Sequence, residues 1–311
     1  MIRVILLSVL VLVVIVTAPF VGQSLADDHS GFIFWQLRVP RVVMASLVGA
    51  VLGLAGAVYQ TIFHNPLATP STVGTTAGAA LGALVAVVLI SPEHLILPLT
   101  VIFAFAGALA VTLLVTAIAA SGRARIEDVL LAGIAISLAA SALASGLQFS
   151  ADIAATFQAV RWSLGHLGQV GYQRVLWLAP VAAIVIGVLL SQRRALQALL
   201  SGEESAFTQG VPVRRVRALS LAAGSLGVGA CVALCGPIAF IGLIVPHLVR
   251  LSIGASRRLL LPLSAVAGAG FLVVCDTVAR TVVDGREIPV GVITAGIGAP
   301  LIVWLVARSR H

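Results

Sequence analysis

The sequence predicts an all-α polytopic membrane protein with about ten transmembrane helices, and three observations support this fold class. First, 60% of the 311 residues are hydrophobic, only 10% are charged, and the mean hydropathy is +1.13; soluble domains carry about 25% charged residues. Second, the apolar residues form runs of about 20, the length that crosses a bilayer as a helix. Third, the arginines lie mostly between these runs. We therefore expect residues 1–311 to form a single transmembrane domain.

Ten apolar runs are the expected spans. They cover Ile2–Phe20, Val42–Phe63, Gly74–Ile90, Ile96–Ala119, Val129–Leu147, Val175–Leu190, Ala218–Cys235, Ile238–Ser252, Leu259–Arg280 and Val290–Ala307. The first run could instead be a signal peptide with Ser24–Ala26 as a poor cleavage site; we expect a retained span because the run is long and more spans follow. Gln148–Arg174 is too polar to span, and Ala154–Gly165 within it is expected to form a short surface helix.

Prolines are expected to interrupt the helical path at two places. Pro66 lies in Asn65–Pro70, directly after the second run, and Pro246 lies inside the short eighth run. Proline has no backbone N–H and its ring clashes with the preceding turn, so each should break a helix. The pair Gly236–Pro237 should separate the seventh run from the eighth.

The arginine distribution predicts the orientation. With both termini on the cytoplasmic side, thirteen of the nineteen arginines fall in cytoplasmic segments, which then have a net charge of +9, while the outer loops are neutral. Cytoplasmic loops of membrane proteins are enriched in arginine and lysine. The same rule explains the basic composition without nucleic acid, which we do not expect as a partner.

A weak internal repeat appears at an offset of 180 residues. Within residues 48–74, seven of 27 positions match residues 228–254, including Gly56 with Gly236 and Pro66 with Pro246; composition alone gives about three. The offset moves the second span onto the seventh, five crossings later, so the two copies would be inverted. Inverted repeats with interrupted helices are typical of transporters.

Residues 191–217 form the longest polar segment and are expected to face the cytoplasm. Apolar residues at helical spacing predict two short helices, one over Arg193–Leu200 and one over Glu203–Gln209, and glycines at 202 and 210 suit their ends. Leu199 and Phe207 would let this hairpin fill a groove on a cytoplasmic protein. The alternative is a solvated connection anchored by arginines.

The sequence contains no catalytic, metal or cofactor site that we can identify. There is no lysine at all, and a P-loop needs a lysine for the nucleotide phosphates, so any ATP chemistry must come from a partner. The six histidines form no pair suited to zinc. Cys231 and Cys235, one helical turn apart, are a conceivable two-ligand site, but small buried side chains explain them better.

Four charged residues at the outer ends of spans are candidate functional residues. Asp276 is the one acid inside an apolar run, and Arg280 follows it by four residues, so we expect an intramembrane ion pair. Arg38, Arg41 and Arg280 either extend along the membrane interface or form a rim that receives acidic side chains of a docking protein.

Several long motifs resemble the FecCD family, the permease subunits of ABC importers for vitamin B12, haem and ferric siderophores. They are Trp35–Arg41, Leu47–Gln60, Asn65–Ala68, Gly202–Gly210, Phe240–Arg250, Asp276–Arg280, Ile288–Ala295 and Gly298–Pro300, and they cover nearly the whole chain. The resemblance implies an inverted-repeat, type II ABC importer permease fold of ten helices in the inner (cytoplasmic) membrane, with no enzymatic activity of its own.

The resemblance also implies partners and site residues. A second permease copy or a paralogue would complete a dimer, with two cytoplasmic ABC ATPase subunits below and a periplasmic substrate-binding protein above. The hairpin residues expected to meet the ATPase are Gly202, Glu203, Glu204, Ala206 and Gly210. Arg38, Arg41 and Arg280 match positions that meet carboxylates of the binding protein.

The sequence constrains the cargo and the energy source of transport less than it constrains the fold. We expect a ferric siderophore because that chelate is common in the family; haem and cobalamin are the alternatives. An ion-gradient-driven secondary transporter is the rival from another class, and it would need ionisable residues facing a cavity. An intramembrane enzyme would need a catalytic constellation, which we do not find.

Overall fold

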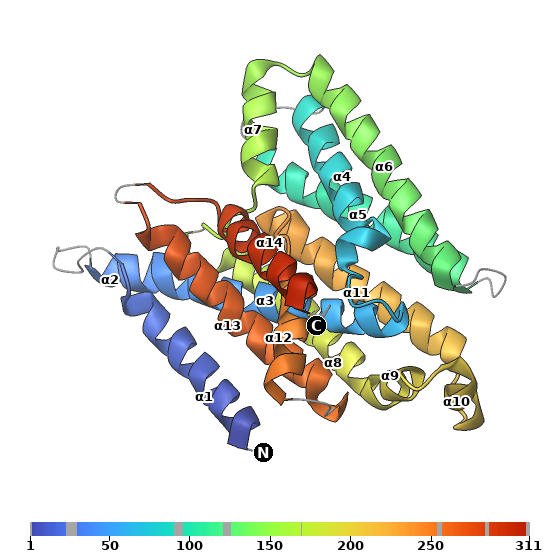
Figure 1. The fold of residues 1–311 in the computed structure, drawn as a ribbon. Helices are drawn as coiled ribbons and strands as arrows, with labels where there is room; N and C mark the ends of the chain where they lie inside the picture. The colour runs from blue at the N-terminus through green and yellow to red at the C-terminus, as the bar shows by residue number, and fades with distance from the viewer. Residues whose placement is uncertain are drawn as a thin grey trace.

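The computed structural model describes residues 2–22, 30–89, 96–120, 126–168, 170–253, 257–283 and 286–308, and its regular elements there are all helical (Figure 1). The α-helices are α1 (Ile2–Thr17), α2 (Ser30–Phe32), α3 (Val39–Ile62), α4 (Thr75–Leu89), α5 (Ile96–Ala120), α6 (Ile126–Ser150), α7 (Ile153–Ser163), α8 (Gln173–Ser191), α9 (Arg193–Leu199), α10 (Glu203–Thr208), α11 (Val213–Cys235), α12 (Ile241–Ile253), α13 (Leu260–Thr281) and α14 (Val290–Arg308). Short 3-10 or π turns are η1 (Ala18–Phe20), η2 (Ile33–Arg38), η3 (Pro70–Val73) and η4 (Arg257–Leu259).

The predicted all-helical membrane fold is confirmed. Seven helices in the described ranges are long and apolar enough to cross a membrane: α1 with η1, η2 with α3, and α5, α6, α8, α11 and α13. Three shorter apolar helices, α4, α12 and α14, lie where the third, eighth and tenth spans were predicted. At 1.5 Å per residue, the 13 residues of α12 cover only about 20 Å of a hydrocarbon core about 30 Å thick.

Helix α3 is the centre of the packing. Most of its residues are buried, and it contacts α8, α11, α12 and α13. Its glycines allow these close approaches: a Cβ on Gly49 would lie 2.2 Å from the carbonyl oxygen of Gly268 in α13, and a Cβ on Gly56 would lie 2.0 Å from that of Gly242 in α12. Small residues at helix crossings let backbones touch, which is how helices pack tightly in lipid.

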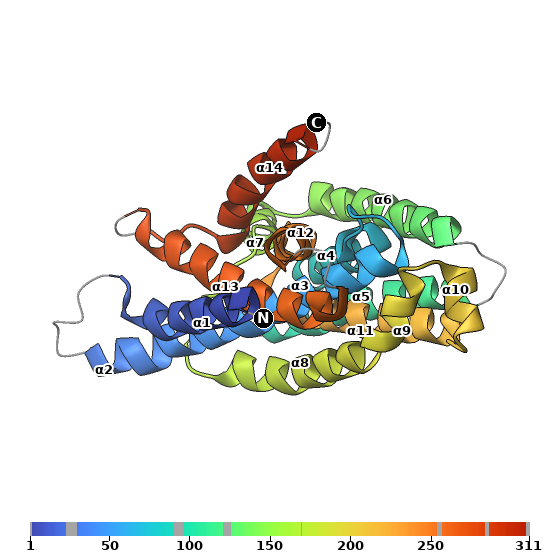
Figure 2. The ribbon, with the colours of Figure 1, turned by 60° about the horizontal axis from the view of Figure 1, so that its bottom comes forward.

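The remaining helices surround this centre. Helices α4 to α7 form a group on one side, and α5 joins it to the centre through α11 (Figure 1). Seen after rotation, α8 runs along the opposite side from α6 and α14 (Figure 2). Much of α1 and α6 is exposed in the single chain, as expected for helices that contact lipid or another subunit.

The structure corrects the predicted break at Pro246. Pro66 lies in the turn after α3, which ends at Ile62, but Pro246 lies within α12, and the helix continues through it. A proline leaves the carbonyl four residues earlier, here that of Gly242, without its usual donor. The side-chain amide of Gln60 donates to this oxygen and to the carbonyl of Leu243, both at 3.3 Å. This donor substitutes for the missing N–H, so the helix is not interrupted.

The predicted break at Gly236–Pro237 is confirmed, since α11 ends at Cys235 and α12 begins at Ile241. Gly236 and Phe240 both adopt positive φ, 71° and 69°, on either side of an irregular stretch. Gly56, which aligns with Gly236 in the proposed repeat, lies inside helix α3, so this aligned pair does not occupy equivalent places in the two helices. Non-helical backbone at membrane depth is tolerated where protein surrounds it.

We name the two ends of the molecule by their features: the hairpin end carries α9 and α10, and the arginine end carries Arg38, Arg41 and Arg280. At the hairpin end, α9 contacts η4, and the Arg3 guanidinium lies 3.5 Å from the Ser252 carbonyl at the end of α12. At the arginine end, the end of α13 meets the start of α3.

Several charged residues of the orientation argument lie outside the described residues: Arg123, Arg125, Arg310, Asp27, Asp28, Glu93 and Asp284. The cytoplasmic orientation stays a prediction, as does the choice between span and signal peptide for the first run, because Ser24–Ala26 is also outside.

Candidate functional site

Two short helices project at the hairpin end, as the sequence predicted. Helices α9 and α10 are joined through Gly202, which has φ 107°, and Gly210, with φ 75°, follows α10 (Figure 1). Both glycines adopt a conformation that other residues rarely take. They therefore set the direction of α10 relative to α9 and α11.

The side chains of this hairpin divide into a buried and an exposed set. Leu196, Leu199 and Ala206 are almost completely buried, and they attach α9 and α10 to the rest of the protein. Phe207 is 77% exposed, and Glu204 is exposed beside it. Leu199 and Ala206 therefore cannot contact an ATPase in this arrangement, contrary to the prediction, whereas Phe207 can.

Glu203 is held by the protein itself. Its carboxylate forms an ion pair with the Arg217 guanidinium at the start of α11. This hydrogen bond lowers the pKa of Glu203 below its ordinary value of 4.5. Because about half of the side chain stays exposed (53%), the carboxylate can still face a partner while it fixes α10 against α11.

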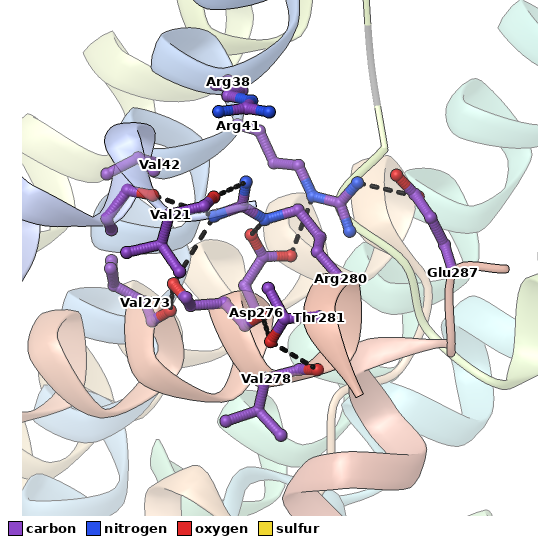
Figure 3. A network of polar contacts seen from close by, with 12 residues as sticks. Val21, Arg38, Arg41, Val42, Val273, Asp276, Val278, Arg280, Thr281 and Glu287 are labelled. Atoms are coloured by element: carbon purple, nitrogen blue, oxygen red, sulfur yellow. Dashed lines mark hydrogen bonds and ion pairs between the residues drawn. The ribbon is translucent and has the colours of Figure 1, made fainter. Parts of the chain in front are cut away.

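A buried network of charges occupies the arginine end (Figure 3). Asp276 pairs with Arg280 on the same helix, with Nε 3.3 Å from Oδ2, so the predicted ion pair is present. Arg41 of α3 reaches the other oxygen, with Nε 2.9 Å from Oδ1, and its Nη1 lies 2.7 Å from the Glu287 carboxylate. Two arginines thus share one buried aspartate, which is 1% exposed.

The three arginines predicted to form a docking rim all point inward. Arg38 donates to the carbonyl of Pro19 at 3.2 Å, and Arg280 donates to that of Ala18, also at 3.2 Å. With Arg41 bound to Asp276, the three side chains fasten α3 and α13 to the turn that ends α1. Sequence analysis missed the pairing of Arg41 because it joins residues 235 positions apart.

His166 lies beside this network, in the connection between α7 and α8. Burial lowers its pKa, and the nearby Arg174, Arg161 and Arg41 lower it further. Its Nδ1 atom is buried and has no hydrogen-bond partner among the residues that the structure describes. The imidazole is therefore neutral near pH 7.

A cavity of about 280 Å³ lies between the two irregular segments of the fold. One wall comes from Leu67, Thr69, Pro70 and Ser71 after α3, and another from residues 237–240 between α11 and α12. The described residues that line it are apolar or carry hydroxyl groups, and none of them has an ionisable side chain. This lining suits uncharged or apolar groups.

The comparison with known families identifies the chain. The profile of the FecCD transport family matches residues 1–308. The chain belongs to this family. A solved inward-facing structure of an ABC transporter assigned to the metal-chelate type superposes with a TM-score of 0.85 at 32% sequence identity, covering 98% of each chain.

Relatives within the FecCD family are similar over most of their length. The hemin transport system permease protein HmuU of Yersinia pestis is 37% identical over 287 residues, which is 92% of this chain and 86% of that protein. The cobalamin import system permease protein BtuC of Halobacterium salinarum is 42% identical over 276 residues, 88% of this chain and 73% of that protein. The vitamin B12 import system permease protein BtuC of Vibrio cholerae is 37% identical over 309 residues, 98% of this chain and 92% of that protein.

Membership in the FecCD family decides the class of the protein. It is a permease subunit of an ABC importer and a multi-pass protein of the inner membrane. Such systems contain an ATPase and a substrate-binding protein. Asp276, the residue that an ion-driven transporter would need in a cavity, is instead enclosed by two arginines.

Proposed function

We propose that the chain moves a bulky metal chelate across the membrane, driven by a separate ATPase that binds the α9–α10 hairpin. The observation that carries this proposal is the exposure of Phe207 and Glu204 on a hairpin whose other face is anchored in the protein. An aromatic side chain flanked by charge, on two short helices outside the apolar spans, has the form of a protein-docking surface.

The proposed mechanism transfers motion through that anchored face. ATP closes the two ATPase subunits, and the hairpins move with them. Buried contacts of Leu196 and Ala206 then carry the motion into a rigid-body change between two permease halves, supplied by a second copy or a paralogue. The outer mouth opens under the loaded binding protein, and hydrolysis returns it to face inward.

Haem and cobalamin are the cargoes we favour over the ferric siderophore, which we expected only because it is common in the family. The support is the naming of three similar relatives as hemin, cobalamin and vitamin B12 permeases. Haem and cobalamin are both large, so the path must be wider than the cavity of the single chain. That width would come from the interface with the second permease subunit.

Docking of the binding protein on Arg38, Arg41 and Arg280 is a separate part of the proposal. Each guanidinium has partners inside the chain, so docking would require the binding protein's carboxylates to share or replace them. Replacing Arg38 with Glu in the assembled importer should weaken binding-protein affinity. Unchanged affinity would restrict these arginines to a structural role.

Transport by the reconstituted importer tests the function. The permease, its ATPase and its binding protein are placed in proteoliposomes, and uptake of haemin, cyanocobalamin and a ferric hydroxamate is measured with ATP and with its non-hydrolysable analogue. We expect ATP-dependent uptake of one tetrapyrrole or corrinoid chelate that ionophores do not abolish. Uptake that follows an ion gradient without ATP would contradict the proposal, and uptake of the hydroxamate alone would contradict the cargo.

A further inference from the structure

His64 has an unusual conformation at the point where the central helix ends. Helix α3 stops at Ile62, and His64 has φ 48°, one of two non-glycine residues in the described chain with positive φ. A left-handed conformation costs a non-glycine residue on the order of 1 kcal/mol or more and persists where other contacts hold it in place. At His64, the side chain makes such a contact.

The imidazole of His64 binds the α9–α10 hairpin. Its Nε2 lies 2.8 Å from the carbonyl oxygen of Leu199, the last residue of α9. A carbonyl accepts only, so Nε2–H is the donor. The same oxygen accepts the backbone N–H of Gly202 at 3.0 Å. His64 therefore fixes the turn between α9 and α10. This turn ends at Gly202, the residue before α10 begins at Glu203.

The residues that follow His64 form a wall of the cavity. The Asn65 side chain accepts the backbone N–H of Leu67 at 2.9 Å, which closes a tight turn. Leu67, Thr69, Pro70 and Ser71 then line the cavity. The path from the hairpin to the cavity wall thus consists of one hydrogen bond and one short, internally bonded turn.

We propose that His64 is a positioning residue that links the ATPase-binding hairpin to the cavity wall at residues 67–71, so that the two move together. The proposal rests on the proposed function, since it assigns a route for the motion delivered to α9 and α10. The alternative contact between these parts is apolar packing of Leu196 and Leu199, which are buried in the core. This packing transmits motion as well, and the hydrogen bond adds a directional contact to one backbone carbonyl, which fixes the register.

Substitutions at His64 distinguish the effect of losing the hydrogen bond from the effect of changing the backbone conformation. Gly and Asn both accept positive φ; His64→Gly removes the donor, and His64→Asn shortens its reach. His64→Gln keeps an N–H donor on a longer side chain and should restore the link. Thr208→Ala is the matched control, because it removes a side-chain bond within α10, to the Ser205 carbonyl, and leaves the contact to α3 intact.

The first measurement is a distance distribution between spin labels attached to Leu67→Cys and Gln209→Cys in the assembled importer in nanodiscs. Both positions are exposed, and the three native cysteines are buried. We expect one narrow distribution with His64 or His64→Gln and a broader one with His64→Gly and His64→Asn. The same narrow distribution in all four proteins would overturn the proposal, whatever the importer carries.

The second measurement is chelate uptake per ATP hydrolysed in proteoliposomes, with the chelate that the wild-type importer transports. We expect His64→Gly to lower this ratio about fivefold or more, a typical coupling effect, with ATP hydrolysis retained and the ratio recovered in His64→Gln. A wild-type ratio in His64→Gly contradicts the role of His64. Absence of ATP-driven uptake in the wild type contradicts the proposed function instead, and the label distances still decide the role of His64.

Discussion

Arg41 Nε donates to Asp276 Oδ1 at 2.9 Å across the contact between α3 and α13. The two residues are buried, and Arg280 approaches the other carboxylate oxygen. Asp276 therefore compensates two guanidinium groups inside the protein, and removing its charge would leave Arg280 without its carboxylate and Arg41 with only the exposed Glu287. This relationship makes Asp276 a structural residue rather than a group on the transport path.

Asp276→Asn should destabilise the protein by about 3–5 kcal/mol, the usual effect of breaking a buried ion pair by removing one partner. Equilibrium unfolding in detergent, followed by tryptophan fluorescence, measures the change. Glu287→Gln is the matched control: Glu287 is 63% exposed, and its loss should cost at most about 1 kcal/mol. Equal stability of wild type and Asp276→Asn would show that the network is not structural.

Gly56→Ala should destabilise the contact between α3 and α12. A Cβ at this position would lie 2.0 Å from the Gly242 carbonyl oxygen, and overpacking typically costs about 1–3 kcal/mol. Gly187→Ala in α8 is the control, since a Cβ there would meet nothing within 4 Å. Thermal unfolding of the two variants should give a lower midpoint for Gly56→Ala only; equal midpoints would contradict the close crossing.

Acid should loosen the hairpin. The pKa of Glu203 is lowered in the folded protein by the hydrogen bond from Arg217, so the stabilisation is present above the ordinary pKa of 4.5 and is lost as the pH falls through the lower folded value. Hydrogen exchange of the α10 amides, corrected for intrinsic rates, should accelerate at pH 3 relative to pH 7. Arg217→Gln should show fast exchange at both pH values, and an identical pH effect in this variant would exclude the ion pair as the cause.

Reversing the charges of the hairpin should uncouple ATP hydrolysis from uptake. In the double variant Glu203→Arg, Glu204→Arg, the permease should still insert, while chelate uptake falls about tenfold or more relative to hydrolysis. Because Glu203 also holds Arg217, Glu204→Arg alone is needed as the cleaner test. Normal uptake in both variants would contradict a role of these carboxylates in coupling.

The sequence predicted the positions of the helices better than the contacts between them. Hydropathy located the apolar helices, and Gly202 and Gly210 marked the ends of α10, because both signals are local. The break at Pro246 was wrong because its rescue by Gln60 comes from a helix 186 residues away in sequence, which no local pattern reveals. Ala206 looked like a contact residue for the same reason: only the packing of α10 shows that it faces inward.

The charged residues show the same limit. The four-residue spacing of Asp276 and Arg280 predicted their pairing, since both lie on one helix face. The addition of Arg41 depends on the close approach of α3 and α13 that Gly49 and Gly268 permit. The position of Arg41 at the outer end of a span did not predict that its guanidinium is bound inside the chain, and docking of the binding protein on Arg41 stays a proposal.

Photo-crosslinking from position 207 tests the central claim most directly. Benzoylphenylalanine replaces Phe207, which is 77% exposed on the hairpin, and in a control it replaces Phe149, which is 94% exposed at the far end of α6. Illumination of the assembled importer should yield a covalent adduct between position 207 and the ATPase subunit, and none with the ATPase from position 149. An adduct of position 207 with the binding protein, or no adduct with the ATPase, would contradict the claim that the ATPase acts through this hairpin.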